Sequence, residues 1–372
     1  MRVLIATDKF AGTLSAAEAG RAIAEGWRRT APDDTVTVAP MADGGPGFID
    51  VLAAAGEGRL QAVTVRGPLG EPVPAVVLLD GETGYVESAQ ACGLHLTEES
   101  ARSPWTASTY GVGQAIGAAI DAGARRIVVG LGGSATADGG AGLLAALGAR
   151  ADVALDAGPR GLDGITSVDL SAVTERMAGV ELVAAADVQT PLLGMFGATK
   201  VFGPQKGLGD EDILAVDRIL DRYVDAVCGT TPAERRTADE HGAGAAGGLG
   251  FALLMLGATV RSGIELVADA VGLYEAAATH DLVVTGEGAF DYSSRAGKVV
   301  HGVAQVAQQA ARPCVVIAGR VDVGSREMRA LGIESAYSVV DHAGEEAAFA
   351  APAEQLSALA ARVARTWSTR WR

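Results

Sequence analysis

The sequence predicts an α/β protein built from two domains. Both ends of the 372-residue chain alternate short apolar runs with segments of helical spacing, a pattern typical of parallel sheets covered on both faces. The middle begins with short apolar runs separated by Pro and Gly, which indicates antiparallel strands. A chain of this length has enough residues for two domains with sizeable cores.

The two ends are predicted to form one discontinuous domain, residues 1–66 plus 282–372, around a Rossmann-like parallel sheet. The strands expected at the two ends are Val3–Ala6, Thr35–Ala39, Asp281–Thr285, Cys314–Ala318 and Ala336–Val340. The helices expected there are Ser15–Trp27, with Ser15 as its cap, Gly47–Ala55, Gly297–Ala310 and Ala353–Trp367.

The middle, residues 67–281, is predicted to be an inserted mixed α/β domain that carries glycine-rich phosphate-binding loops. The strands expected in the middle are Val63–Arg66, Ala75–Leu79, Gly84–Glu87, Arg126–Leu131 and Leu182–Ala185. The expected helices are Gly111–Ala122, Gly140–Leu147, Glu211–Val227 and one near 244–257, and residues 191–209 are interpreted as a Gly/Pro-rich stretch. An active site is expected in the interdomain cleft, near the carboxyl ends of the parallel strands.

Composition excludes several classes of function. Forty-five acidic and 30 basic residues give a net charge of −15, so neither nucleic acid nor an anionic membrane is an expected partner. The three cysteines lie far apart, without the spacing of a zinc site or a disulfide scaffold. No run approaches 18 apolar residues, and the N-terminal apolar run is too short for a signal peptide. We therefore expect a cytoplasmic monomer or homodimer that acts on a small-molecule substrate.

Lysine is scarce, with four residues at positions 9, 200, 206 and 298 against 26 arginines. Codon bias in the genome explains why arginine replaces lysine at most positions. The four remaining lysines are candidates for sites that need a compact ammonium group. Lys206 lies between glycines, as a phosphate-neutralising lysine would, and Lys298 begins a predicted helix.

Two glycine-rich loops follow predicted strands. In the first, 41–47, Asp43 suits either Mg²⁺ or a substrate hydroxyl, or else caps the next helix. The second, 130–142, brings backbone amides, two hydroxyls and a carboxylate to a helix start, which is anion-binding chemistry. Its candidate residues are Gly132, Gly133, Ser134, Thr136 and Asp138. This loop also matches GxGxxA, but the helix begins too far beyond Thr136 for a dinucleotide fingerprint.

Further acids lie at the ends of predicted strands. Asp8, Asp187 and Glu287 each follow an apolar run, and Asp291 lies shortly after Glu287. Acids together with lysines suit phosphoryl transfer, which depends on positioning and charge neutralisation more than on covalent chemistry. No GxxxxGK[ST] or GxSxG pattern occurs, so a P-loop protein and a serine hydrolase are not indicated.

Several of these segments occur together in one family. The motifs are Asp8-Lys-Phe-Ala-Gly-Thr-Leu-Ser15, Ala42-Asp-Gly-Gly45, Val86-Glu-Ser-Ala-Gln-Ala-Cys-Gly-Leu94, Gly132-Gly-Ser-Ala-Thr136 with Asp138-Gly-Gly140, Asp187-Val, Phe202-Gly-Pro-Gln-Lys-Gly207, Gly242-Ala-Gly-Ala-Ala-Gly-Gly-Leu-Gly250 and Thr285-Gly-Glu-Gly288. In this order, from residue 3 to about 319, the chain resembles the bacterial type I glycerate kinase family. The resemblance implies two α/β domains, one inserted in the other, and phosphorylation of D-glycerate by ATP with Mg²⁺, giving 2-phosphoglycerate.

Roles follow as hypotheses from the residues and the resemblance. Catalysis is assigned to Asp43, Asp187, Glu287 and Lys206, and substrate binding to Asp8 and Lys9. Phosphate or nucleotide binding is assigned to Gly132, Gly133, Ser134, Thr136, Asp138 and Lys298, and Mg²⁺ binding to Asp187, Glu287 and Asp291. The acceptor of the hydroxyl proton stays open between Asp43 and Asp187.

The chain departs from the family pattern at Ala11, Pro46, Ala137 and the stretch Tyr292-Ser293-Ser294, where polar side chains are usual. These departures fit a changed substrate or pocket. Two alternatives remain open: an inactive relative that binds nucleotide or hydroxy acid, and a nicotinamide-dependent hydroxy-acid dehydrogenase.

Overall fold

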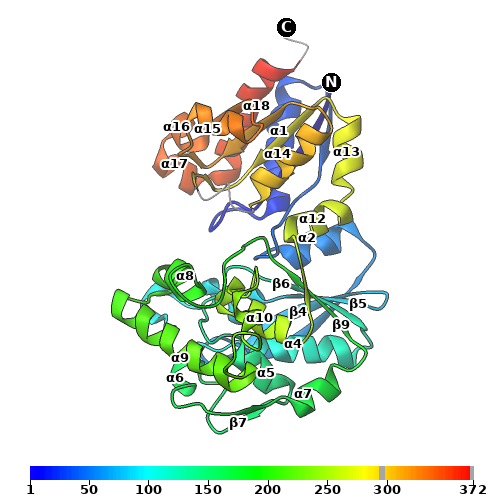
Figure 1. The fold of residues 1–372 in the computed structure, drawn as a ribbon. Helices are drawn as coiled ribbons and strands as arrows, with labels where there is room; N and C mark the ends of the chain where they lie inside the picture. The colour runs from blue at the N-terminus through cyan, green and yellow to red at the C-terminus, as the bar shows by residue number, and fades with distance from the viewer. Residues whose placement is uncertain (293–297, 369–372) are drawn as a thin grey trace. The chain divides into compact units, whose positions relative to one another are not determined.

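The computed structural model describes residues 1–292 and 298–368, and the chain forms two compact units (Figure 1). Unit 1 comprises Met1–Asp43, Asp50–Ala55 and Ile264–Arg372, and unit 2 comprises Gly44–Ile49 and Gly56–Gly263. Each unit contains a sheet covered by helices, which confirms the predicted α/β class and the insertion of one domain in the other.

Unit 1 contains a five-stranded parallel sheet in the order β15-β13-β11-β1-β2. Its strands are β1 (Arg2–Thr7), β2 (Thr35–Val38), β11 (Leu282–Gly286), β13 (Cys314–Ala318) and β15 (Ser335–Ser338). The chain runs outward from β1 to β2 on one side, and from β11 to β13 and β15 on the other. The winding therefore reverses between β1 and β11, and open α/β sheets bind ligands at such a reversal, outside the carboxyl ends of the strands.

Helices cover both faces of this sheet. On one face α1 (Ala16–Thr30) packs along α18 (Pro352–Trp367), and Ile23 and Trp27 of α1 are buried in one core cluster with Val3 and Ile5 of β1. On the other face α13 (Leu273–Thr279) and α14 (Val299–Gln309) contact β1 and each other. Ser15 caps α1 as predicted, in a reciprocal capping box with Glu18.

Unit 2 contains a six-stranded sheet in the order β10-β9-β6-β5-β4-β3. Its strands are β3 (Arg59–Arg66), β4 (Pro72–Asp80), β5 (Thr83–Glu87), β6 (Arg126–Gly130), β9 (Glu181–Ala185) and β10 (Thr259–Arg261). The first three pair antiparallel as predicted, whereas β5, β6, β9 and β10 are parallel. The carboxyl ends of these four parallel strands therefore lie at one edge of the sheet.

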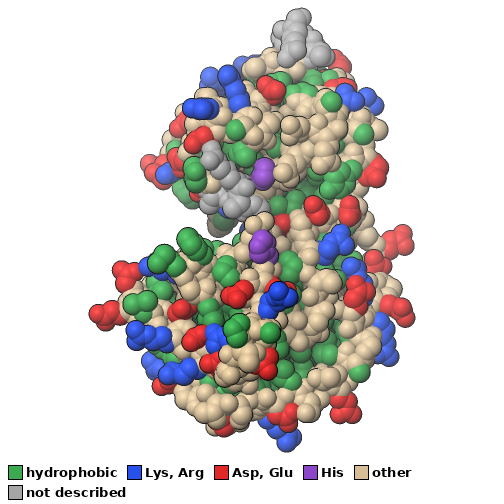
Figure 2. Space-filling view, viewed as in Figure 1, with side chains coloured by type: hydrophobic (Ala, Val, Ile, Leu, Met, Phe, Trp, Pro, Cys, Tyr) green, Lys and Arg blue, Asp and Glu red, His purple; other side chains and the backbone are tan. Residues whose placement is uncertain are grey.

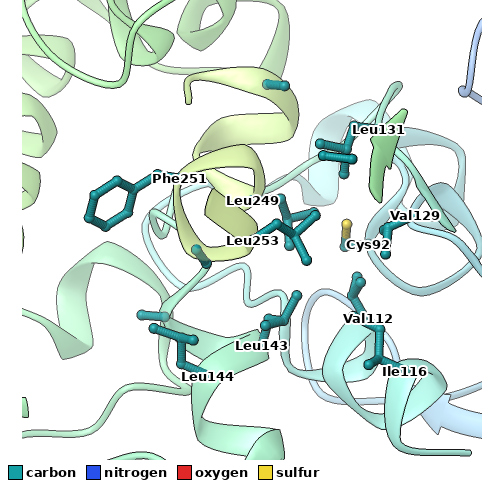
Figure 3. Packing of buried hydrophobic residues seen from close by; sticks show 14 of the residues in the cluster. Cys92, Val112, Ile116, Val129, Leu131, Leu143, Leu144, Leu249, Phe251 and Leu253 are labelled. Atoms are coloured by element: carbon teal, nitrogen blue, oxygen red, sulfur yellow. The ribbon is translucent and has the colours of Figure 1, made fainter. Parts of the chain in front are cut away.

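The core of unit 2 lies between β6 and its covering helices (Figure 3). The helices of unit 2 are α3 (Ala89–Cys92), α4 (Tyr110–Asp121), α5 (Ala141–Leu147), α6 (Gly158–Gly161), α7 (Ser171–Arg176), α8 (Ala198–Lys206), α9 (Asp210–Cys228), α10 (Arg236–Asp239) and α11 (Leu249–Met255). Cys92 is a fully buried free thiol in the same cluster as Val112, Ile116 and Leu253, so it packs as a small apolar residue.

The remaining elements are short. They are α2 (Phe48–Ala55), α12 (Gly263–Ala270), α15 (Ser325–Ala330), α16 (Val339–Ala343), α17 (Glu345–Ala350), the two-residue strands β7 (Arg150–Ala151), β8 (Val168–Asp169), β12 (Ala289–Phe290) and β14 (Arg320–Val321), and 3₁₀ turns at Leu94–Leu96, Glu99–Ala101 and Ala245–Gly247. On the face shown in Figure 2, acidic and basic side chains alternate over both units. No helix in the described part of the chain is long and apolar enough to cross a membrane.

Three predicted segments differ from the structure. Residues 191–209 contain the helix α8, so Lys206 ends a helix rather than lying in a turn. The helix expected near 244–257 is split, because Gly247 and Gly248 adopt φ of +72° and +96°, and α11 begins only at Leu249. The strand expected to reach Val340 ends at Ser338, whose hydroxyl caps α16.

The expected domain boundaries at 66/67 and 281/282 also differ from those of the compact units. Strand β3 pairs along its whole length with β4, which places it in unit 2. Helix α13 contacts β1 and α14, which places it in unit 1. The start of the helix predicted at Gly297 lies outside the described residues.

Candidate active site

In unit 1, three acids lie where the carboxyl ends of the central strands meet. Asp8 follows β1, Glu287 follows β11 and Asp43 lies shortly after β2. The Asp8 amide donates a 2.9 Å hydrogen bond to the Gly286 carbonyl, which joins the ends of β1 and β11 at the reversal of winding. The sheet topology therefore places these predicted residues at the position where ligands of such folds bind.

These residues line a cavity of about 580 Å³ within unit 1. Among the described residues, its charged lining consists of the acids Asp8, Asp43, Glu287 and Asp322 and the basic residues Lys9, Lys298 and Arg320. A volume of this size is typical of small-molecule sites. The cavity thus brings together five side chains that sequence reasoning selected from four separate segments.

The pKa of the Asp8 carboxyl is raised by its surroundings. Its pKa is raised to about 7, mainly by burial and also by the negative charges of Asp43 and Glu287, against the lowering effect of the positive charge of Lys9. The Lys9 amide donates a 2.8 Å hydrogen bond to Asp8 Oδ1, and Lys9 Nζ lies 3.5 Å from the same oxygen. A cation at this place would relieve the repulsion among the three carboxylates.

Lys298 directly precedes the first turn of α14, and its side chain lies beside Glu287 and Asp291. Its Nζ is 3.7 Å from Glu287 Oε2 and 3.9 Å from Asp291 Oδ1. The lysine therefore neutralises two of the acids predicted to bind metal, while part of its side chain stays exposed and able to meet an anionic ligand.

In unit 2, Asp187 follows β9 at the edge where the parallel strands end. Its Oδ1 accepts a 2.5 Å hydrogen bond from the Ser262 hydroxyl, and its Oδ2 accepts a 3.1 Å hydrogen bond from the Gly263 amide. Both partners follow β10, the neighbouring strand. These bonds fix the orientation of the carboxylate, as a catalytic or ligand-binding acid requires.

Asp138, predicted to bind phosphate, is fully buried in unit 2. Its carboxylate accepts hydrogen bonds from the Thr109 amide and hydroxyl, both at 2.8 Å, and from the amides of Gly140 and Gly142 at 3.1 and 3.2 Å. Burial raises its pKa, and these hydrogen bonds oppose the rise. The carboxylate thus ties the start of α5 to the residue before α4, and its acceptor positions face protein rather than a ligand.

Lys206, predicted to be catalytic, is buried with only 3% of its surface exposed. Its Nζ donates hydrogen bonds to the Ser134 hydroxyl at 3.0 Å and to the Thr136 carbonyl. Burial lowers its pKa to about 8, and the nearby Cys92 and Asp138 oppose the decrease. The geometry makes Lys206 a support of the glycine-rich loop.

The glycine-rich loop is also held from its other side. The Ala135 amide donates to the Cys92 carbonyl at 2.7 Å, and the Leu94 amide donates to the Gly133 carbonyl at 2.8 Å. Gly133 adopts φ +64°, and a side chain at Gly132 would come within 2.8 Å of the Gly45 backbone. The loop therefore has a fixed course that needs glycine at both positions.

Two residues with a clear structural part in these loops were not selected from the sequence. Glu87, at the end of β5, is buried and accepts hydrogen bonds from the amides of Gly47 and Ile49 at 3.1 and 3.2 Å, at the start of α2. Gly247 provides the space beside Lys206, because a Cβ there would lie 2.8 Å from Lys206 Nζ and overlap the Thr136 carbonyl. The position of Glu87 at a strand end was a signal for it. Gly247 lies in the glycine-rich motif 242–250, but the motif does not indicate which of its glycines faces Lys206.

The structure divides the selected residues between the units. Those in unit 1 are Asp8, Lys9, Asp43, Glu287, Asp291 and Lys298, and those in unit 2 are Gly132, Gly133, Ser134, Thr136, Asp138, Asp187 and Lys206. Within residues 1–292 and 298–368, no group of three His, Cys, Asp or Glu side chains is arranged as a metal site by itself. The assignment of Asp187, Glu287 and Asp291 as the metal ligands stays a prediction.

The structure also places the departures from the family pattern. Ala11 lines the cavity, Ala137 is buried, and Ser293 lies outside the described residues.

Comparison with known proteins gives a consistent result. The model of the glycerate kinase family matches residues 3–368. Glycerate kinase of Bacillus subtilis (strain 168) is 41% identical over 347 residues, covering 91% of this chain and 90% of the relative. Glycerate 2-kinase of Escherichia coli (strain K12) is 39% identical over 353 residues, covering 92% of each. The crystal structure of "putative glycerate kinase 2" from Salmonella typhimurium LT2 superposes with a TM-score of 0.78 at 38% identity, covering 98% of both chains. The chain therefore belongs to the glycerate kinase family of enzymes.

Proposed function

We propose that this enzyme transfers the γ-phosphoryl group of ATP to a hydroxyl of D-glycerate, with 2-phosphoglycerate as the product. The observation that carries the proposal is the cavity of unit 1, where Asp8, Asp43, Glu287, Lys9 and Lys298 are among the residues that line one space beside the carboxyl ends of β1 and β11. Membership of the family supports a kinase reaction on glycerate.

The donor set fits a Mg²⁺ ion that is carried by the nucleotide. Magnesium prefers oxygen ligands and is commonly bound through one or two carboxylates, with substrate phosphates and waters completing its coordination. Asp8, Asp43 and Glu287 supply such oxygens, and their mutual repulsion favours a cation. When bound, the ion neutralises charge on the phosphates of the donor.

The residues of unit 1 would then act on both reactants. Lys298, beside Glu287, would stabilise the transferring phosphoryl group, and Lys9 would pair with the glycerate carboxylate. The glycerate hydroxyl oxygen forms a bond to the γ-phosphorus while the bond to the bridging oxygen of ADP breaks. The hydroxyl proton passes to a carboxylate, either Asp43 or Asp187.

The residues of unit 2 would contribute a preformed anion-binding loop. Backbone amides of the segment 132–136, apart from the Ala135 amide that is bonded to Cys92, would contact phosphate, as expected for glycine-rich turns. Lys206 and Asp138 act as positioning residues, because their polar atoms bind the loop and its flanking helices.

The proposal is tested by measuring ADP release from ATP and Mg²⁺, with D-glycerate, L-glycerate, glycolate, lactate and tartronate as acceptors. Turnover with D-glycerate supports the proposal, and a ³¹P spectrum of the product identifies the phosphorylated hydroxyl. Turnover with another acid would mean that Ala11, Pro46 and Ala137 accompany a changed pocket. Thermal stabilisation by ATP without turnover on any acceptor would favour an inactive binding relative instead.

A further inference from the structure

The cavity of unit 1 has a second end that the acids and lysines do not occupy. The helices after β15 contribute only apolar residues to its lining: Val339 and Val340 from α16, Ala348 and Phe349 from α17, and Pro352 and Leu356 from α18. None of these side chains can hydrogen-bond to the carboxylate or hydroxyls of a small hydroxy acid. This end therefore suits an apolar, flat part of a ligand.

The two ends are well separated along the sheet. The acids follow β1 and β11, whereas α16 begins directly after β15, the edge strand. Because neighbouring strands lie about 4.8 Å apart, the ends of β1 and β15, three spacings apart, are separated by roughly 14 Å. A ligand that fills both ends is elongated, anionic at one end and apolar at the other, and glycerate is too short.

Phe349 offers an aromatic ring at this end, and 63% of its surface is exposed. Nucleobases stack on such rings irrespective of their hydrogen-bonding pattern. The first residue of the same helix, Glu345, forms an ion pair with Arg320 of β14 at 2.5 Å. Arg320 also lines the cavity, so this pair ties α17 to the cavity wall.

We propose that this apolar end binds the purine ring of the phosphoryl donor, with Phe349 as the stacking surface. The inference rests on the proposed function, since it assigns the nucleoside part of the same ATP molecule. The triphosphate then extends along the ends of β13 and β11 toward Lys298 and the three acids. Val339, Val340 and Leu356 exclude water from the other face and edge of the ring.

The test uses calorimetric titration of the whole protein with Mg-ADP and, separately, with Mg-pyrophosphate. Phe349→Ala is expected to raise the Kd for Mg-ADP about tenfold, because a stacking partner of the base is lost. Its Kd for Mg-pyrophosphate, which has no base to stack, should stay at the wild-type value. Phe349→Tyr should retain tight binding of ADP. Leu60→Ala, which removes a comparably exposed apolar side chain from β3 in unit 2, is the matched control.

The outcomes separate the two proposals. Wild-type affinity for Mg-ADP in Phe349→Ala, or an equal loss of ADP and pyrophosphate binding, overturns the purine subsite and leaves the proposed function standing. A wild-type protein that binds neither ligand overturns the proposed function and the subsite with it. Because Phe349 is largely exposed, loss of the fold is not expected, and a thermal unfolding curve of each variant verifies this.

Discussion

The Lys206 ammonium, on the last residue of α8, donates a 3.0 Å hydrogen bond to the Ser134 hydroxyl in the loop after β6. A second bond reaches the Thr136 carbonyl two residues on. A lysine that the sequence suggests as a phosphate ligand thus holds the course of the loop from within unit 2. Because Lys206 is buried, changes in its charge and in the space around it should alter the unfolding free energy of the protein.

The charge of Lys206 should make stability depend on pH. Burial lowers its pKa from 10.5 to about 8, so the folded protein binds this proton less tightly than the unfolded chain. The cost of the buried charge is present below pH 8 and falls as pH rises toward 10.5. Between pH 7 and 9.5, the wild-type protein should gain up to about 2 kcal/mol of unfolding free energy relative to Lys206→Met. Urea unfolding at both pH values measures the difference.

Lys200→Met is the control for this experiment, since Lys200 lies on the same helix with an exposed side chain. Its difference from wild type should be the same at both pH values. A pH-independent difference for Lys206→Met as well would show that Lys206 is not buried as described.

The space beside Lys206 should accept glycine but not alanine at position 247. Gly247→Ala places a methyl group 2.8 Å from Lys206 Nζ and against the Thr136 carbonyl, at φ +72°. Gly207→Ala has a similar positive φ, +99°, but nothing lies within 4 Å of the new atom. Gly247→Ala should therefore lose roughly 2 kcal/mol more unfolding free energy than Gly207→Ala. Equal losses in urea unfolding would mean that only backbone conformation matters at Gly247.

Asp187 should be needed for turnover but not for folding. Asp187→Asn keeps the shape of the side chain, but its amide nitrogen cannot accept the hydrogen bond from Ser262 or Gly263 that the carboxylate accepts. We expect kcat to fall roughly 100-fold, with the circular dichroism spectrum unchanged. Asp152→Asn, at an exposed acid that accepts similar bonds from Thr166 and Ser167, should retain wild-type kcat. Near wild-type kcat in Asp187→Asn would remove this residue from the mechanism.

The sequence predicts most of the sheet strands, since apolar runs such as those of β6 and β13 are easily recognised. It misses β10, which has only three residues and a single apolar side chain. The helix α8 was missed because Pro204 and the glycines around it are typical of loops, yet the helix tolerates Pro204 inside it. Domain boundaries depend on pairing between distant segments, such as β3 with β4, which no local pattern specifies.

The candidate site shows a similar limit. The strand-end pattern predicts where acids gather, and the cavity with Asp8, Asp43 and Glu287 agrees with it. The same pattern does not distinguish these acids from Asp138, whose carboxylate is saturated by backbone amides and a hydroxyl. Burial of a polar group depends on the packing of distant elements, so only the structure separates a ligand-facing acid from a supporting one.

The central claim is that the acids at the ends of β1 and β11 carry the phosphoryl transfer, and Glu287→Gln tests it most directly. The variant keeps the volume of the side chain but removes the charge that lies 3.7 Å from Lys298 Nζ. In the ADP-release assay with D-glycerate, kcat should fall roughly 100-fold, while Asp281→Asn, at an exposed acid of the same unit, keeps wild-type kcat. A folded Glu287→Gln protein with wild-type kcat and an unchanged requirement for Mg²⁺ would contradict the account.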